Sequence, residues 1–79
     1  MKVTLIIATR NEEGAIGSTL REVPRDVVDE IIVVDGHSKD NTWNEVKAEL
    51  RPSDKLVLQK GKGYGGAFLE GFDIATGDV

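Results

Sequence analysis

The residues best suited to chemistry lie in two short polar segments, each placed directly after an apolar run. Asp35 ends the run Ile31–Val34 and leads into a glycine and several turn-forming residues. Asn11 and Glu12 follow an earlier run that ends at Thr9. Open α/β sheets bind ligands at the carboxyl ends of their parallel strands. A carboxylate and an amide there suit the hydroxyls of a ribose or the edge of a base, so the two segments predict a nucleotide-sugar site.

Each of these residues also has a purely structural interpretation, and both interpretations stay open. Asn11 is a favourable helix N-cap, with acids after it on the positive end of the helix dipole. Asp35 is desolvated at the end of an apolar strand and needs donors. An Asx-turn with Ser38 and Asp40 would supply them, and so would a nucleobase N–H or a ribose hydroxyl. His37 is a lone loop histidine, and we expect it to be solvated rather than catalytic.

A third polar segment is rich in glycine, and residues 61–66 match the pattern G-x-G-x-x-G. In a dinucleotide fold that pattern follows the first strand, with an acid about 20 residues later. Here it follows the third expected strand, and the sequence ends before the position where such an acid would stand. Lys60 and Lys62 beside bare backbone amides instead predict an anion site. The alternative is a flexible loop with two solvated lysines.

Strands must alternate with helices to place these segments together. The expected strands are residues 2–9, 30–35 and 55–59. The expected helices run from an Asn11 cap to Pro24, from a capping box at Thr42–Glu45 to Pro52, and from Tyr64 to Ala75 with Gly77 as C-cap.

This alternation predicts one α/β unit over residues 1–79, a three-stranded parallel sheet with right-handed crossovers and βαβαβα topology. The expected strand order is 3-2-1, the first half of a Rossmann-like, doubly wound fold, so all three strand-to-helix loops share one rim. Asp78 and Val79 look like the start of a fourth strand. Without that strand the edge of the first strand stays unpaired, and we expect a homo-oligomer through this edge.

The bulk composition excludes several classes. A net charge of −4 and a pI of about 4.8 argue against a nucleic-acid partner. Zero cysteines exclude disulfides and cysteine-ligated metal sites. The longest wholly apolar runs, Leu5–Ala8 and Ile31–Val34, are far too short to span a bilayer, and we expect no secretory signal at Met1–Lys2, which leads straight into a strand. We therefore expect a cytoplasmic location.

Taken together, the segments resemble the amino-terminal part of glycosyltransferase family 2, which has the GT-A fold, and within it the dolichol-phosphate mannose or glucose synthases. Residues 8–12 resemble the family's Pro-x-Tyr-Asn-Glu turn, and residues 34–42 its Val-Asp-Asp-Gly-Ser-x-Asp-Gly-Thr segment. Residues 60–67 and 75–78 match its Lys-Gly-x-Gly-x-Ala and Ala-x-Gly-Asp segments. Three residues depart from the family pattern: Ala8 replaces proline and Arg10 replaces tyrosine, which affects stacking on the base, and Gly36 replaces the second aspartate, which removes one contact to base or ribose.

The resemblance implies transfer of a hexose from a GDP- or UDP-sugar to a polyprenyl (dolichyl) phosphate, with inversion, at the cytoplasmic face of a membrane. It assigns six residues to the nucleotide sugar: Ala8, Arg10, Asn11 and Glu12 at the nucleoside, Asp35 at the base or ribose, and Lys62 at phosphate. The family binds Mg²⁺ or Mn²⁺ through an Asp-x-Asp motif that would lie about one strand beyond Val79. Residues 1–79 therefore form a partial domain that supplies no metal ligand and no nameable catalytic residue, and we expect this chain alone to be inactive.

Two other functions stay open on the sequence. A dinucleotide-binding oxidoreductase half-domain predicts NADH binding that depends on Gly61 and Gly63. A non-catalytic, truncated interaction module predicts that no nucleotide binds at all.

Overall fold

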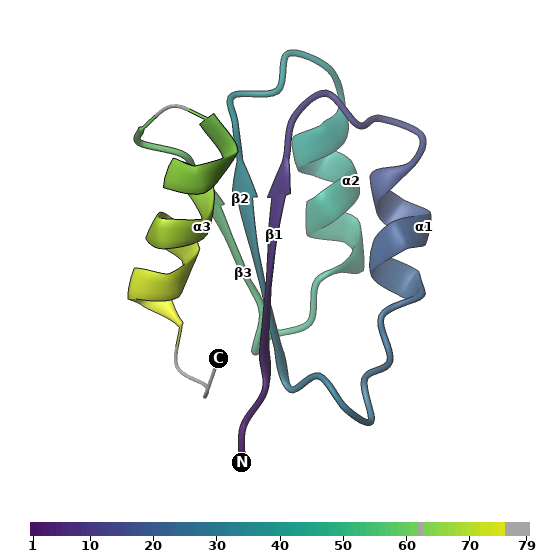
Figure 1. Ribbon diagram of the computed structural model, residues 1–79. Helices are drawn as coiled ribbons and strands as arrows, with labels where there is room; N and C mark the ends of the chain where they lie inside the picture. Colours follow the sequence, from purple (N-terminus) through teal and green to yellow (C-terminus); the bar gives the residue numbers. More distant parts are fainter. Residues whose placement is uncertain (62, 76–79) are drawn as a thin grey trace.

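The computed structural model describes residues 1–61 and 63–75 as a parallel sheet covered by helices on both faces (Figure 1). The strands are β1 (Thr4–Thr9), β2 (Glu30–Asp35) and β3 (Lys55–Leu58). The helices are α1 (Ile16–Arg21), α2 (Thr42–Glu49) and α3 (Gly63–Ile74). The predicted βαβαβα order is confirmed.

The sheet has the order β1-β2-β3, which confirms the predicted 3-2-1 arrangement with β2 in the centre. The register pairs Thr9 with Asp35 and Asp35 with Leu58, so the three strands end side by side at one rim. Among the described residues no strand pairs with the outer edge of β1. The predicted fourth strand at 78–79 and the predicted C-cap Gly77 lie outside the described residues.

The central strand β2 is buried along its whole length because helices cover both of its faces. Ile31 and Val33 pack on the side of α1 and α2, and Ile32 and Val34 on the other side. The backbone of α3 lies close to this second face. A Cβ added at Gly71 would lie only 2.5 Å from Cγ2 of Ile6, so glycine is what permits the close approach.

The predicted start of the first helix is wrong by four residues, since the N-cap is Ala15 and not Asn11. The helix begins at Ile16, and its N-cap, Ala15, makes no side-chain capping bond. Asn11 adopts a left-handed conformation (φ 51°), and its Oδ1 accepts a hydrogen bond from the Lys39 N–H at 2.8 Å instead of capping. Gly14 has φ 87° and completes the turn that delays the helix.

The capping box predicted for the second helix is also wrong. Thr42 is the first helical residue, and the N-cap Asn41 makes no side-chain capping bond. The Thr42 hydroxyl donates to Asp40 Oδ1 at 2.5 Å. The Glu45 carboxylate accepts from the distant Gly14 N–H at 2.9 Å. Glu45 has therefore taken a tertiary partner in place of the expected local one, whereas the Thr42 hydroxyl donates locally, to a residue two positions before it.

The opposite end of the sheet is held by a buried carboxylate. Asp54, whose side chain is fully buried, accepts two hydrogen bonds from the Arg25 guanidinium. It also accepts the backbone N–H groups of Ile31 and Arg51, both at 2.8 Å. Burial alone would raise the pKa of Asp54, but these hydrogen bonds outweigh it and hold the pKa below its ordinary value. The start of β2 is thus fixed independently of the rim.

Candidate functional site

The candidate site lies at the carboxyl ends of the three strands, the upper end of the sheet in Figure 1. The loops after β1, β2 and β3 meet there, as the parallel topology predicts. The Gly36 N–H donates to the Thr9 carbonyl and the Gln59 N–H to the Asp35 carbonyl, both at 2.8 Å. These bonds join segments that are more than twenty residues apart in the sequence.

Asp35 finds its donors inside the second loop. Asp35 is only 2% exposed. Both oxygens of its carboxylate accept hydrogen bonds from Ser38. The Ser38 hydroxyl donates to Oδ1 at 2.5 Å, and the Ser38 N–H donates to Oδ2 at 3.1 Å. The sequence left open whether Asp35 forms a structural turn or binds a ligand. The structure shows the turn, which is formed with Ser38 and not with Asp40. Asp35 thus organises the loop whether or not it also contacts a ligand.

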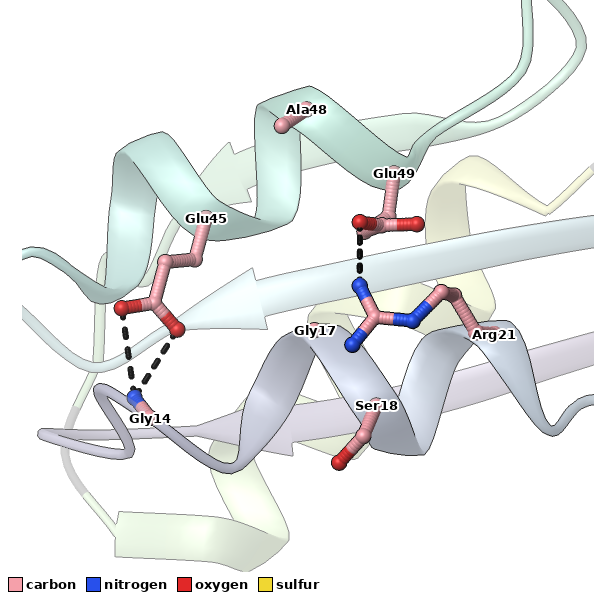
Figure 2. Close-up of a pocket in the computed structure, with 7 residues that line it drawn as sticks. All are labelled: Gly14, Gly17, Ser18, Arg21, Glu45, Ala48 and Glu49. Atoms are coloured by element: carbon pink, nitrogen blue, oxygen red, sulfur yellow. Dashed lines mark hydrogen bonds and ion pairs between the residues drawn. The ribbon is translucent and has the colours of Figure 1, made fainter.

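The first and second loops interlock through an unbroken series of backbone donors. Four successive N–H groups bind side chains of the second loop and α2: Asn11 to Ser38 Oγ (2.8 Å), Glu12 to Thr42 Oγ1 (2.7 Å), Glu13 to Asp40 Oδ2 (3.2 Å) and Gly14 to Glu45 Oε1 (2.9 Å). Figure 2 shows the Gly14 nitrogen facing both oxygens of Glu45. In return, the Asn41 N–H donates to Glu13 Oε1 at 2.9 Å. The two loops therefore form one unit.

This unit presents two ionic side chains that the protein itself leaves unused. Arg10 is exposed and Glu12 half-buried, and within the described residues neither side chain has a hydrogen-bond or ion-pair partner. The side-chain amide of Asn11 between them is committed to the second loop. Ala8 packs against the apolar face under α3. Lys62, the predicted phosphate contact, lies outside the described residues.

The third loop differs from the prediction that its backbone amides are bare. The N–H groups of Lys60 and Gly61 donate to Glu70 Oε1 and Oε2 at 2.6 and 2.9 Å. These two bonds, first from Gly61 and then from Lys60, hold the pKa of Glu70 below its ordinary value. Sequence reasoning missed Glu70 because it lies in the middle of α3, nine residues from the loop, where an acid usually faces solvent.

His37 links the second loop to the third. Its Nε2 lies 2.7 Å from the Gln59 carbonyl oxygen, which only accepts, so Nε2 carries the proton. The residue has φ 63°, a conformation that residues with a Cβ rarely adopt. The side chain is exposed at the rim, in line with the predicted solvated role.

A separate hollow of about 240 Å³ lies between α1 and α2 (Figure 2). Its lining residues are mostly small, with three charged side chains: Gly14, Gly17, Ser18, Ala48, Arg21, Glu45 and Glu49. The Arg21 guanidinium pairs with Glu49 at 2.6 Å, and Glu45 already binds the Gly14 N–H. The charged groups of this hollow are thus engaged with the protein, unlike Arg10 and Glu12.

The described part of the chain offers no group of three or more His, Asp or Glu side chains that would hold a metal ion. The described residues therefore assemble no cluster that would hold Mg²⁺ or Mn²⁺ by protein ligands alone. Over the same residues, no helix is long and apolar enough to cross a membrane.

Comparison with known proteins assigns a family to this arrangement. The family model "Glycosyl transferase family 2" matches residues 4–79. An uncharacterized glycosyltransferase of Nostoc sp. is 36% identical over 86 aligned residues, which cover 100% of this chain and 26% of that protein. A dolichol-phosphate mannosyltransferase of Pyrococcus furiosus is 33% identical over 84 residues, covering 100% of this chain and 24% of that protein. No solved structure matches the chain significantly.

The chain spans about a quarter of the length of these curated relatives. The family match extends over all three rim loops and over every strand and helix described above. The resemblance stated from the motifs is thereby confirmed. The chain belongs to glycosyl transferase family 2.

Proposed function

We propose that this chain forms the nucleotide-binding part of a transferase that moves a hexose from a GDP- or UDP-sugar to an acceptor. One observation supports the proposal above all. Arg10 and Glu12 are ionic side chains without internal partners, carried at the rim by a loop whose backbone is fixed by four consecutive hydrogen bonds. A site held in this way loses little conformational entropy when a ligand binds.

The chemistry of the two free side chains suits a nucleoside. The Glu12 carboxylate accepts hydrogen bonds and matches the paired hydroxyls of a ribose. The planar Arg10 guanidinium stacks on an aromatic base and donates to its carbonyl oxygens. Asn11 and Asp35 contribute by holding the loops on which these groups stand, and Ala8 borders the site from β1. Lys62 is assigned to phosphate on the family pattern alone.

The acceptor is a finer proposal. The relative from Pyrococcus furiosus bears the name dolichol-phosphate mannosyltransferase, which favours a polyprenyl phosphate. A phosphate acceptor arrives already anionic, so its attack needs no general base and rests on positioning and charge stabilisation. A divalent metal in the whole transferase would stabilise the leaving diphosphate. The chain's own described residues bind and orient the donor, and the proposal assigns them no catalytic step.

The proposal is tested by titrating the ¹⁵N-labelled chain with GDP, UDP and NADH and following its amide resonances. We expect GDP or UDP to shift residues 10–12 and 35–38, with or without Mg²⁺. If both nucleotides leave these resonances unchanged while NADH moves Gly61 and Gly63, the proposed nucleoside site at residues 10–12 is refuted and the glycine-rich loop binds a dinucleotide instead. If none of the three shifts any resonance, the chain by itself does not bind the donor nucleotide and the proposal is refuted for this piece.

Two neighbouring acids provide a matched pair of variants. The Glu12 carboxylate is free among the described residues, whereas that of Glu13 accepts the Asn41 N–H at 2.9 Å. Glu12→Ala should weaken nucleotide binding about 10-fold, the loss of one hydrogen bond to a charged group, without lowering the free energy of unfolding. Glu13→Ala should lower the free energy of unfolding by about 0.5–1 kcal/mol and change affinity less. The reverse pattern would refute the assignment of Glu12.

We also propose self-association through the outer edge of β1. Residues 5–8 of this strand are apolar and half-buried, and no described strand pairs with that edge. Unpaired apolar edges recruit other strands. Sedimentation of the chain at several concentrations tests this proposal, and a monomer throughout would refute it.

A further inference from the structure

The third rim loop is closed by the protein's own carboxylate. Glu70 reaches from the middle of α3 to the consecutive N–H groups of Lys60 and Gly61, with one oxygen on each. The family assignment and the proposed nucleoside site give this contact no role. It lies beside the second loop, because His37 binds the carbonyl of the residue that precedes Lys60.

The geometry of the contact is that of anion recognition. Two successive backbone N–H groups that converge on one ligand form an anion-binding concavity. Hydrogen bonds to an ionised acceptor are short and strong, as the 2.6 and 2.9 Å distances to Glu70 are. The amide pair therefore already holds a bound anion, although that anion belongs to the chain. The two oxygens of a phosphate present the same kind of acceptor edge.

We propose that Glu70 is an internal competitor for the phosphates of the donor. While its carboxylate is bound to Lys60 and Gly61, the amides of the third loop are closed to an external phosphate. A diphosphate binds these amides only by displacing the Glu70 carboxylate. The Glu70 side chain then rotates away while its backbone stays in α3. The inference rests on the proposed function for the identity of the ligand, but the competition itself is a property of these three residues.

A contact that only fastens the loop would behave differently. If Glu70 merely keeps the amides in place, its removal disorders the loop and weakens any anion binding there. If it competes, its removal strengthens that binding. The sign of the effect therefore separates the two roles.

The test is a titration of the ¹⁵N-labelled chain with sodium pyrophosphate, followed at the Lys60 and Gly61 amides. In Glu70→Gln the apparent Kd for pyrophosphate should fall at least about 5-fold relative to the unmodified chain. Glu22→Gln removes the same charge from an exposed position just after α1 and should leave the Kd within about 2-fold. Glu70→Asp keeps the charge but shortens the reach to the two amides, so it too should bind pyrophosphate more tightly.

The competition is refuted if Glu70→Gln and Glu70→Asp bind pyrophosphate no more tightly than the Glu22→Gln control. It is equally refuted if neither amide responds in any variant, since the pair would then not be an anion site. Resonances of β2 report whether each variant is folded. Failure of the proposed function is visible separately, as the absence of GDP- or UDP-induced shifts at residues 10–12, and leaves the pyrophosphate result intact.

Discussion

Replacing Ser38 by alanine should loosen the unit formed by the first two rim loops. The Ser38 hydroxyl donates to Asp35 Oδ1 at 2.5 Å and accepts from the Asn11 N–H at 2.8 Å. The substitution removes both bonds. It leaves the weaker bond from the Ser38 N–H to Asp35 at 3.1 Å. A carboxylate that is almost fully buried thereby loses its strongest donor.

The expected cost follows from the two bonds. A hydrogen bond to a charged group contributes about 1.5–3 kcal/mol, and the buried position of Asp35 places this one in the upper part of that range. Asn11 is exposed, so its N–H regains a water partner and adds only about 0.5 kcal/mol. Ser38→Ala should thus lower the free energy of unfolding by about 2.5–3.5 kcal/mol. Domains of this size have about 4–12 kcal/mol in total.

Urea denaturation followed by circular dichroism measures this loss as a lower midpoint with an unchanged m-value. Ser18→Ala is the matched control, because the Ser18 hydroxyl binds only the Ala15 carbonyl in its own helix, at 3.1 Å. Alanine is the better helix former, so the control should be neutral or slightly stabilising. A loss below about 0.5 kcal/mol for Ser38→Ala would show that Asp35 is satisfied without this hydroxyl, and would refute the reasoning.

Three further predictions concern stability, and each is read from urea denaturation. Gly71→Ala should lower the free energy of unfolding by about 1–3 kcal/mol through overpacking, since the new Cβ would lie 2.5 Å from Ile6; an unchanged midpoint would mean that α3 does not pack so closely. Gly14→Ala should cost about 1–2 kcal/mol from its φ of 87° alone, because no atom lies within 4 Å of the new Cβ. Gly17 lies inside α1, and the new Cβ would meet only the end of a flexible arginine side chain, so Gly17→Ala should instead stabilise the fold by about 0.5–1 kcal/mol. If Gly14→Ala and Gly17→Ala change the free energy of unfolding in the same direction, this account is contradicted. The pKa of Asp54 is held low in the folded state, so its stabilisation is present above pH of about 4 and is lost as the pH falls through the folded pKa. The loss of stability between pH 6 and pH 3 should therefore be smaller in Asp54→Asn, and an equal loss would refute the role of Asp54.

The sequence predicted the strands and their order well because burial on both faces leaves an unambiguous signal. Residues 31–34 form one continuous apolar run, and the structure buries all of them. The alternation of apolar runs with helical patterns predicted the same parallel arrangement. Family membership followed from the motifs at the strand ends, which the family model matches over residues 4–79.

The helix starts were predicted poorly because the capping residues found better partners far away in the sequence. Asn11 and Glu45 are residue types that cap helices locally. In the fold, Asn11 and Glu45 bind backbone groups 28 and 31 residues away. Only the rim brings these groups together, and a local pattern carries no information about such a contact. The same holds for Glu70, whose target amides lie on another element.

These contacts divide the rim into two parts with different properties. The first and second loops are tied by six reciprocal hydrogen bonds between backbone and side chains, so the nucleoside side is preorganised. The third loop is held to the second by His37 and closed by a single side chain, Glu70. A nucleotide would thus meet a fixed surface for its base and ribose and a replaceable internal anion for its phosphates. Binding of the phosphates exchanges one anion, Glu70, for another, whereas binding of the base and ribose displaces no internal group. Phosphate groups should therefore contribute less to affinity than their charge suggests, and the nucleoside should contribute more.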